Sequence, residues 1–505
     1  MKILYIGNET AHTDLLVSKI AEKNHTFNKG LISSADADVS DDGYYHTTVV
    51  DLHSGDIIQN LAKKFDRIEF LEQPLESYPN YKTFVTTLRL FCDLEQEGYP
   101  VSFRNKKYTE NFMFWKNFLQ ENKSFCFYPF LALVEDSGYS RICPKNSHQI
   151  DPNNQYIDWQ NNQEINLIRD KMISGERLSN ANKTCSMCYE HEDYGQESAR
   201  QFETLEWAIR INAKSVDDFK KTKHPMVYEL RPSNTCNIMC RTCDDSYSHL
   251  IEREFKKLKF PLQPINFTNT NFDKINFETC QSIYVGGGEP TVIPEFYDFL
   301  RKCISIGKTN FNLNIGTNGQ KISSTLLELL SHFPKVCFAF SFDGFQKIND
   351  YIRWGTDFDT VVSNSRLVRS QGHQVSLQTV FSMYSLTRIH EVFEFYDTEF
   401  PNTGLLINFA STLDFTRIDP FNHPCRELVV ESMLKCQKTR MYYTNGRSVK
   451  TSVDSVLKYY TDPNFKLDLE KLKTFFNYND KIDKSRNSKL VDYIPELADA
   501  KKIIL

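Results

Sequence analysis

The chain has 505 residues, a formal net charge of −5, 40% hydrophobic residues and 25% charged residues. This length exceeds what one hydrophobic core usually supports, so we expect several domains in a water-soluble, globular protein. The acidic balance leaves no electrostatic footprint for nucleic acid or an anionic membrane surface, and we expect neither as a partner.

The first residues, MKILYIGNETAH, form a short apolar run closed by polar residues, and we predict neither a signal peptide nor a membrane span there. The longest apolar run, FCFYPFLALV, is too short to cross a bilayer. We therefore expect a cytoplasmic protein. Thirteen cysteines in a reducing compartment favour metal or redox chemistry over disulfides.

Residues 1–110 alternate between strand-like and helix-like runs. The strand-like runs are ILYIG, HTTVVDL, RIEFLEQP and PVSFRN, and the stretches between them have helical patterns. This alternation predicts a small parallel sheet with flanking helices, a Rossmann- or flavodoxin-like α/β domain. No G-x-G-x-x-G follows the first strand, so we predict no dinucleotide site. A docking or substrate-recruiting domain and a second ligand site both remain open.

Residues 111–206 break this alternation and are rich in Asn, Tyr and acidic residues. They hold a close C-x2-C pair, Cys185 and Cys188, and two distant thiols, Cys126 and Cys143. Such a set suits a site with four thiolate ligands. By spacing alone, zinc and an iron–sulfur cluster fit equally well.

Alternation returns over residues 220–415. The six strand-like runs are MVYEL, SIYVGG, NFNLNIGT, KVCFAFSF, VSLQTVFS and LLINFAS, with helical stretches such as PEFYDFLRKCISI between them. This predicts a six-stranded parallel sheet with outer helices, curved as a partial, TIM-like (β/α)6 barrel. Residues 416–505 are predicted to form a mostly helical tail that packs on the barrel.

Three cysteines lie on the loop TCNIMCRTCDD, directly after the first of these strands: Cys236, Cys240 and Cys243. Thiolates are soft ligands that suit zinc or iron–sulfur clusters. A closed zinc site needs a fourth ligand, for which His249 is a candidate. A cubane held by three cysteines instead leaves one iron open. The loop by itself leaves both possibilities standing.

The C-x3-C-x2-C spacing resembles the signature of the radical S-adenosylmethionine (SAM) superfamily. Three further stretches match that family in order, each at the end of a successive strand: GGEP at Gly287–Pro290, GTNG at Gly316–Gly319, and SFDG at Ser341–Gly344 followed by Arg353. The resemblance covers residues 225–411. It implies that the three cysteines bind three irons of a [4Fe-4S] cluster and that SAM chelates the fourth.

The resemblance also implies contacts with SAM. Gly287 and Gly288 would let the backbone approach its methionine end, because they have no Cβ. Glu289 would receive the ammonium group or fix the loop. Ser341 would lie near the ribose or carboxylate, and the guanidinium of Arg353 would pair with the carboxylate.

Three positions in these motifs have less defined roles. Thr317 and Asn318 are candidates for ribose contacts. Asp343 is interpreted as a turn former rather than a ligand. Thr242 stands where many members of the family carry an aromatic residue against the adenine, so at most a backbone contact is expected there.

The cysteine-rich segment resembles a twitch domain, the half-length auxiliary-cluster module of SPASM/twitch radical SAM enzymes, here placed before the barrel. The matching residues are the four cysteines of this segment, Trp159, the Gly175–Glu176 pair and Ser198–Arg200. The resemblance implies a second [4Fe-4S] cluster held by those four cysteines. Such a fully ligated cluster would transfer electrons or support the segment structurally.

The resemblance as a whole implies an enzyme that reductively cleaves SAM to a 5′-deoxyadenosyl radical and removes hydrogen from a substrate. A one-electron reductant such as flavodoxin or ferredoxin is the expected partner. The first hypothesis for the substrate is a peptide or protein, because SPASM/twitch enzymes often act on peptides. The second is a small metabolite such as a sugar or nucleotide conjugate. A non-catalytic redox or scaffold protein is the third, and the set of SAM motifs argues against it.

Overall fold

The computed structural model describes nearly all of residues 106–504, except 137–138, 145–148, 151–158, 179–184, 194–197, 264–271, 402, 411–412 and 445. Before residue 106 it describes 3–7, 27–29, 44–48, 67–70, 88–89, 91–92, 95–96, 98 and 101–102. The chain divides into two units, described separately below. Unit 1 comprises residues 1–130, 166–223 and 443–447, and unit 2 comprises 131–165, 224–442 and 448–505. Residues 131–165, expected within the twitch segment, lie in unit 2.

Unit 1 contains a five-stranded parallel sheet in the order β2-β3-β1-β4-β5. Its strands are β1 Ile3–Gly7, β2 Phe27–Lys29, β3 Tyr44–Thr48, β4 Arg67–Phe70 and β5 Val101–Ser102. The four predicted strands are present, and the three-residue β2 was not predicted. The helices predicted between Gly7 and Arg67 lie outside the described residues.

The helices of unit 1 enclose an aromatic core. Trp115 is fully buried, its ring lies 5.2 Å from that of Phe219 and 5.8 Å from that of Phe125, and its indole N–H donates to the Ala213 carbonyl at 2.8 Å. Burying rings of this size stabilises the unit strongly, because aromatic side chains remove so much apolar area from water. Among the described residues, the helices that lie wholly in unit 1 are α4 Lys106–Glu121, α7 Ser186–Asp193, α8 Ala199–Arg210 and α9 Val216–Lys220, and most of α6, Gln163–Ser174, also lies in it.

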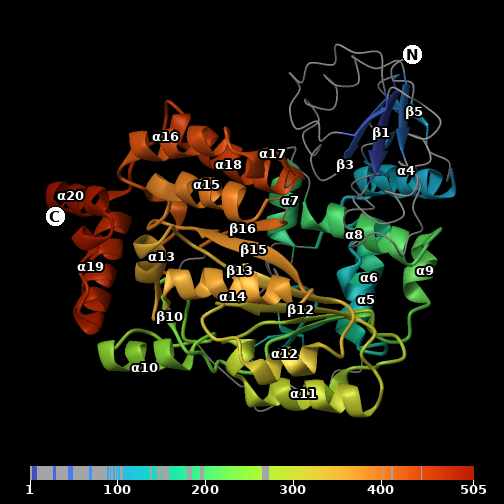
Figure 1. Cartoon of the computed structure of the whole chain (residues 1–505), viewed down its shortest axis with the longest axis horizontal. Helices are drawn as coiled ribbons and strands as arrows, with labels where there is room; N and C mark the ends of the chain where they lie inside the picture. Colours follow the sequence, from blue (N-terminus) through green and yellow to red (C-terminus); the bar gives the residue numbers. More distant parts are fainter. Residues whose placement is uncertain are drawn as a thin grey trace. The chain divides into compact units, whose positions relative to one another are not determined.

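Unit 2 is built on a nine-stranded sheet in the order β16-β15-β13-β12-β11-β9-β6-β7-β8. Figure 1 labels β16, β15, β13 and β12 of this sheet. The six predicted strands are confirmed, all parallel: β9 Val227–Leu230, β11 Ser282–Val285, β12 Asn312–Thr317, β13 Val336–Ser341, β15 Gln374–Phe381 and β16 Leu405–Phe409. Three strands were not predicted: β6 Ala132–Asp136, which runs parallel to β9, and β7 Tyr139–Arg141 and β8 Gln149–Ile150, which complete an antiparallel extension.

Helices connect the parallel strands, because two parallel strands need a long crossover connection between them. Alternate strand residues such as Ile283, Leu313 and Ile315 are fully buried, while the intervening positions are only partly buried. Each fully buried aliphatic side chain stabilises the fold by about 1.5–3 kcal/mol. The connecting helices are α11 Pro294–Ser305, α12 Ser324–Leu330, α13 Lys347–Ile352, α14 Phe358–Ser370 and α15 Ile389–Glu399.

The C-terminal part of the chain is helical, as expected, and part of it belongs to the core of unit 2. Phe475, Phe476 and Ile482 of helix α19 join one buried cluster with Phe255 and Ile352. The helices are α16 Arg426–Cys436, α17 Arg440–Thr444, α18 Gly446–Thr461, α19 Leu469–Arg486 and α20 Pro495–Ile504. Among the described residues, none of the helices is both long enough and apolar enough to cross a bilayer.

Candidate functional site

The three-cysteine loop begins at the carboxyl end of β9 and leads into helix α10, His249–Leu258. Inside it, β10 (Met239–Cys240) pairs antiparallel with β14 (Arg353–Trp354), which places Arg353 opposite Cys240. The backbone N–H of Cys236 donates to Nδ1 of His249 at 3.2 Å. The imidazole considered as a zinc ligand therefore orders the start of the loop.

The glycines of the GGEP motif pack against this same loop. The Gly288 N–H donates to the Ser233 carbonyl at 2.9 Å, and the Glu289 N–H donates to the Thr235 carbonyl at 2.8 Å. A Cβ on Gly288 would lie 2.0 Å from the Thr235 oxygen, and Gly287 has a φ of +109°. The close backbone approach that these glycines permit is therefore an approach to the cysteine loop.

Burial raises the pKa of all three loop thiols, that of Cys236 to about 12. Neighbouring thiols act in the same direction: Cys240 on Cys236, and both of them on Cys243. The thiols are thus close enough to influence one another, and their thiolate forms need a compensating positive charge. Metal binding supplies such a charge and removes the protons.

The chemistry of the three thiols suits an iron–sulfur cluster, because thiolates are soft ligands. In a cubane each of the three cysteines binds a different iron. Three neighbouring thiols on a loop at a strand end fit three irons of a [4Fe-4S] cluster.

Glu289 is buried and fully engaged by the protein. One carboxylate oxygen accepts from the N–H and hydroxyl of Thr291, at 3.1 and 2.8 Å, and from the Thr317 hydroxyl at 2.7 Å. The other accepts from the Asn318 N–H at 2.6 Å. Burial raises the pKa of Glu289, and these donors oppose the rise. Of the two roles expected for it, fixing the loops agrees with these bonds.

Asn318 connects this network to the cysteines. Its side-chain amide donates to Oδ1 of Asn237 at 2.8 Å and lies 4.0 Å from Sγ of Cys236. The GGEP and GTNG strand ends therefore meet at the cysteine loop. Asn237 of the cysteine loop was not predicted as a site residue, and it takes part in this contact.

Arg353 is held by Asp343. Its Nη1 donates to Oδ2 of Asp343 at 2.7 Å, and Oδ1 of the same carboxylate accepts from the Val380 N–H at 2.9 Å. Burial alone would lower the pKa of this guanidinium, but the nearby Cys240, Asp343 and Cys236 raise it above its usual value. Its buried Nε–H has no hydrogen-bond partner among the described residues. Interpreting Asp343 as only a turn former was incomplete, because its side chain orients this cation.

Thr242 and Ser341 are partly buried, Thr242 on the cysteine loop and Ser341 at the last position of β13. The two remain candidates for SAM contacts by their place in the motifs.

Unit 1 gathers three of the four remaining candidate cysteines. Burial raises the pKa of Cys126, and the nearby thiols of Cys185 and Cys188 raise it further. Burial also raises the pKa of Cys185 to about 12, with a further contribution from Cys188. Cys143 belongs to unit 2, so its membership of this set remains a prediction.

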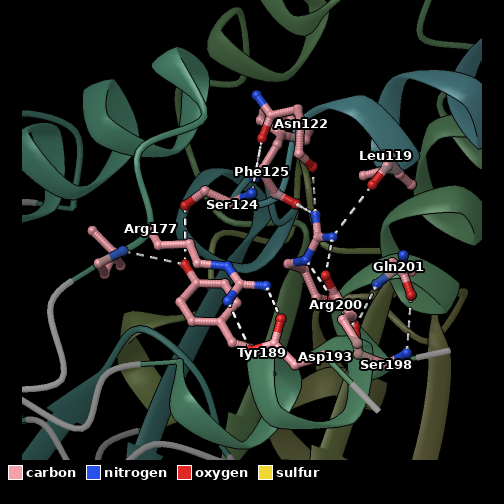
Figure 2. Close-up of polar contacts among 12 residues, drawn as sticks. Leu119, Asn122, Ser124, Phe125, Arg177, Tyr189, Asp193, Ser198, Arg200 and Gln201 are labelled. Atoms are coloured by element: carbon pink, nitrogen blue, oxygen red, sulfur yellow. Dashed lines mark hydrogen bonds and ion pairs between the residues drawn. The ribbon is translucent and has the colours of Figure 1, made fainter. Parts of the chain in front are cut away.

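Arg200 forms hydrogen bonds with two separate segments of unit 1 near Cys126 (Figure 2). Its guanidinium donates to both carboxylate oxygens of Glu192, at 2.8 and 2.7 Å, and to the Phe125 carbonyl at 2.8 Å, next to Cys126. Both charged side chains are buried, and the Arg200 charge opposes the raised pKa of Cys126 and Cys185. Arg200 thus fixes the backbone that carries the first of these thiols.

The other twitch-like residues have structural roles. Ser198 caps helix α8 in a capping box with Gln201. Gly175, with a φ of +80°, follows helix α6, Gln163–Ser174. In unit 2, the indole N–H of Trp159 donates to the Ala132 carbonyl at 3.0 Å.

Comparison with known proteins gives a family match and a few distant relatives. The Radical SAM superfamily profile matches residues 230–395. An uncharacterized protein of Methanothermobacter thermautotrophicus is 32% identical over 113 residues, which are 22% of this chain and 43% of that protein. The match thus spans less than half of that relative.

Two solved structures share low identity with the chain. Native anSMEcpe with bound AdoMet is 16% identical, with 44% of this chain and 64% of that chain covered at a TM-score of 0.35. Streptococcus suis SuiB bound to the precursor peptide SuiA is 16% identical, with 68% and 69% covered at a TM-score of 0.28.

Proposed function

Because residues 230–395 form a radical SAM domain, we propose that this protein reductively cleaves SAM at a [4Fe-4S] cluster bound by Cys236, Cys240 and Cys243. One observation carries the proposal: the three thiols lie where the GGEP, GTNG and SFDG strand ends meet, with Arg353 paired opposite Cys240. When bound, the cluster and SAM supply a carbon-centred radical that removes a hydrogen atom from the substrate.

Different residues of the site would have different roles in binding SAM. Arg353 offers a buried guanidinium whose Nε–H is unpaired among the described residues, which suits a carboxylate such as that of SAM. Asp343 keeps that guanidinium in place. Glu289 joins the GGEP and GTNG loops through its four accepted hydrogen bonds, so both present their backbone beside the cysteines.

The proposal extends to a second [4Fe-4S] cluster on Cys126, Cys143, Cys185 and Cys188. It is supported by the mutual influence of three of these thiols in unit 1 and by the twitch-like sequence around them. With four protein ligands such a cluster has no open iron, so its role would be electron transfer or support of the fold. A flavodoxin or ferredoxin would supply the electrons for SAM cleavage.

For the substrate we favour a peptide or protein over a small sugar or nucleotide conjugate. The reason is the resemblance of the cysteine-rich segment to a twitch domain. Size-separated cell extract, with and without protease treatment, distinguishes the two in a 5′-deoxyadenosine assay. Stimulation by a large, protease-sensitive fraction would support a peptide or protein substrate. Stimulation by the small fraction would support the metabolite.

The primary test is anaerobic reconstitution followed by measurement of iron, the electron paramagnetic resonance (EPR) spectrum and 5′-deoxyadenosine. The triple variant Cys236→Ala, Cys240→Ala, Cys243→Ala should lose SAM cleavage and about half of roughly eight irons per chain. Cys436→Ala, in helix α16, is the control and should keep both. Full 5′-deoxyadenosine production by the triple variant would refute the proposal.

A further inference from the structure

Helix α19 reaches the three-cysteine loop from more than two hundred residues away in the sequence. In Figure 1 it lies beside β10, α10 and α13, and side-chain contacts confirm this placement. We infer that α19 is a positioning element for the cluster, holding the backbone on both sides of Cys240 through two buried arginine clamps. This inference rests on the proposed function.

The first clamp is centred on Arg241, the residue after Cys240, whose side chain is completely buried. Its guanidinium donates to Oδ1 of Asp483 at 2.6 Å and to Oδ1 of Asn479 at 3.0 Å, both on α19. It also donates to the Ser488 hydroxyl at 3.0 Å. A residue of the cysteine loop is thus bonded to α19 and to the residues that follow it.

Residues around α13 complete this first clamp. The Arg241 guanidinium lies 3.7 Å above the Tyr351 ring, and its Nε–H donates to the Tyr351 carbonyl at 3.0 Å. The Tyr351 hydroxyl donates in turn to Oδ1 of Asp483 at 3.0 Å. The backbone N–H of Arg241 donates to the Ile352 carbonyl at 2.6 Å. Both the backbone and the side chain of Arg241 are therefore fixed.

The second clamp reaches the other side of Cys240. Arg486 of α19 donates to the Met239 carbonyl at 2.8 Å. Its guanidinium also binds Glu254 of helix α10 at 3.1 and 2.6 Å, with both side chains buried. Since α10 follows the cysteine loop directly, Arg486 connects the middle of the loop to its end.

Because both clamps are buried, they serve to position the loop rather than only to stabilise it. A buried ion pair adds little net stability compared with apolar residues of the same size, because both charges lose their hydration. Its directed hydrogen bonds nevertheless permit one geometry. The apolar cluster around Phe475 and Phe476 also holds α19, whereas the clamps bind the loop itself and therefore specify its path.

The test compares two substitutions on α19. Asp483→Asn weakens the Arg241 clamp, and Asp480→Asn, which removes an exposed ion pair with Lys501, is the matched control. The reconstituted Asp483→Asn protein should release iron to a chelator about tenfold faster than wild type, because a buried cation loses its counter-charge. The EPR g-values of its reduced, SAM-bound cluster should shift, whereas Asp480→Asn should match wild type.

A second readout needs no cluster. In the iron-free protein, hydrogen–deuterium exchange of residues 236–243 should be faster in Asp483→Asn than in Asp480→Asn. If Asp483→Asn does not fold, Ser488→Ala, which removes one hydroxyl from the same clamp, replaces it. Wild-type iron release, g-values and exchange in the folded variant would overturn the inference. A wild-type protein that binds no cluster would overturn the proposed function, while the exchange experiment still decides on the clamp.

Discussion

Two buried carboxylates near the cysteine loop have different tasks at the scale of single residues. Asp343 accepts from a guanidinium and a backbone N–H, and so fixes the direction of a cation. Glu289 accepts only from neutral donors and holds two loops together. Both carboxylates are almost completely buried, so burial does not distinguish them. The difference between their roles therefore follows from their hydrogen-bond partners.

Asp343→Asn should raise the KM for SAM about tenfold, because the amide leaves the Arg353 charge less well held. The rate at saturating SAM should change less, since the cluster ligands remain. The measurement is 5′-deoxyadenosine formation against SAM concentration. Asp359→Asn, at an exposed position of α14, is the control and should match wild type. An unchanged KM in folded Asp343→Asn would show that Asp343 has no part in SAM binding.

Gly288→Ala should prevent cluster binding, because its Cβ would lie 2.0 Å from the Thr235 carbonyl oxygen and push the cysteine loop away. Iron content after anaerobic reconstitution checks this. Gly404→Ala is the matched control, since nothing lies within 4 Å of a Cβ there. Normal iron content in Gly288→Ala would mean that the two loops tolerate separation.

At the scale of elements, helices α7 and α8 of unit 1 are joined by Arg200, whose ion pair with Glu192 is buried. Figure 2 also shows a second ion pair on the same unit, between Arg177 and Asp193. Both of these side chains are exposed. The two pairs have similar geometry and different surroundings. Their contributions to stability should therefore differ.

Arg200→Met should reduce the free energy of unfolding of unit 1 by about 3–5 kcal/mol, because Glu192 is left buried without its partner. Arg177→Met should cost at most about 1 kcal/mol, since water screens an exposed pair. Chemical denaturation followed by tryptophan fluorescence measures both. Equal losses of unfolding free energy for the two variants would contradict a larger stabilising role for the buried Arg200–Glu192 pair.

The chain divides into two compact units, with Trp115 in the core of unit 1 and Phe475 and Phe476 in a core cluster of unit 2. Calorimetry should therefore show more than one unfolding transition, because each core can melt cooperatively by itself. Trp115→Phe, in the aromatic core of unit 1, should lower only one of these transitions. A single transition that shifts as a whole would show that the units unfold together.

Local pattern was sufficient for much of the fold. The six parallel strands of unit 2 and four strands of the small sheet follow from apolar runs alternating with helical stretches. Strands β6–β8 were not predicted, because β6 pairs with β9 across almost a hundred residues and short strands carry little periodicity. Pairing between distant segments depends on the packed sheet and leaves no local signal.

The sequence by itself determined the chemistry of the candidate site: which residues carry thiols, and which motifs end successive strands. Only the tertiary structure decided how these parts are held. It gave Glu289 its donors, placed Asp343 on Arg353 and brought Asp483 and Arg486 of α19 to the cysteine loop. Spacing can reveal a ligand set because ligands lie close in sequence. Buried ion pairs join residues that only the folded chain brings together.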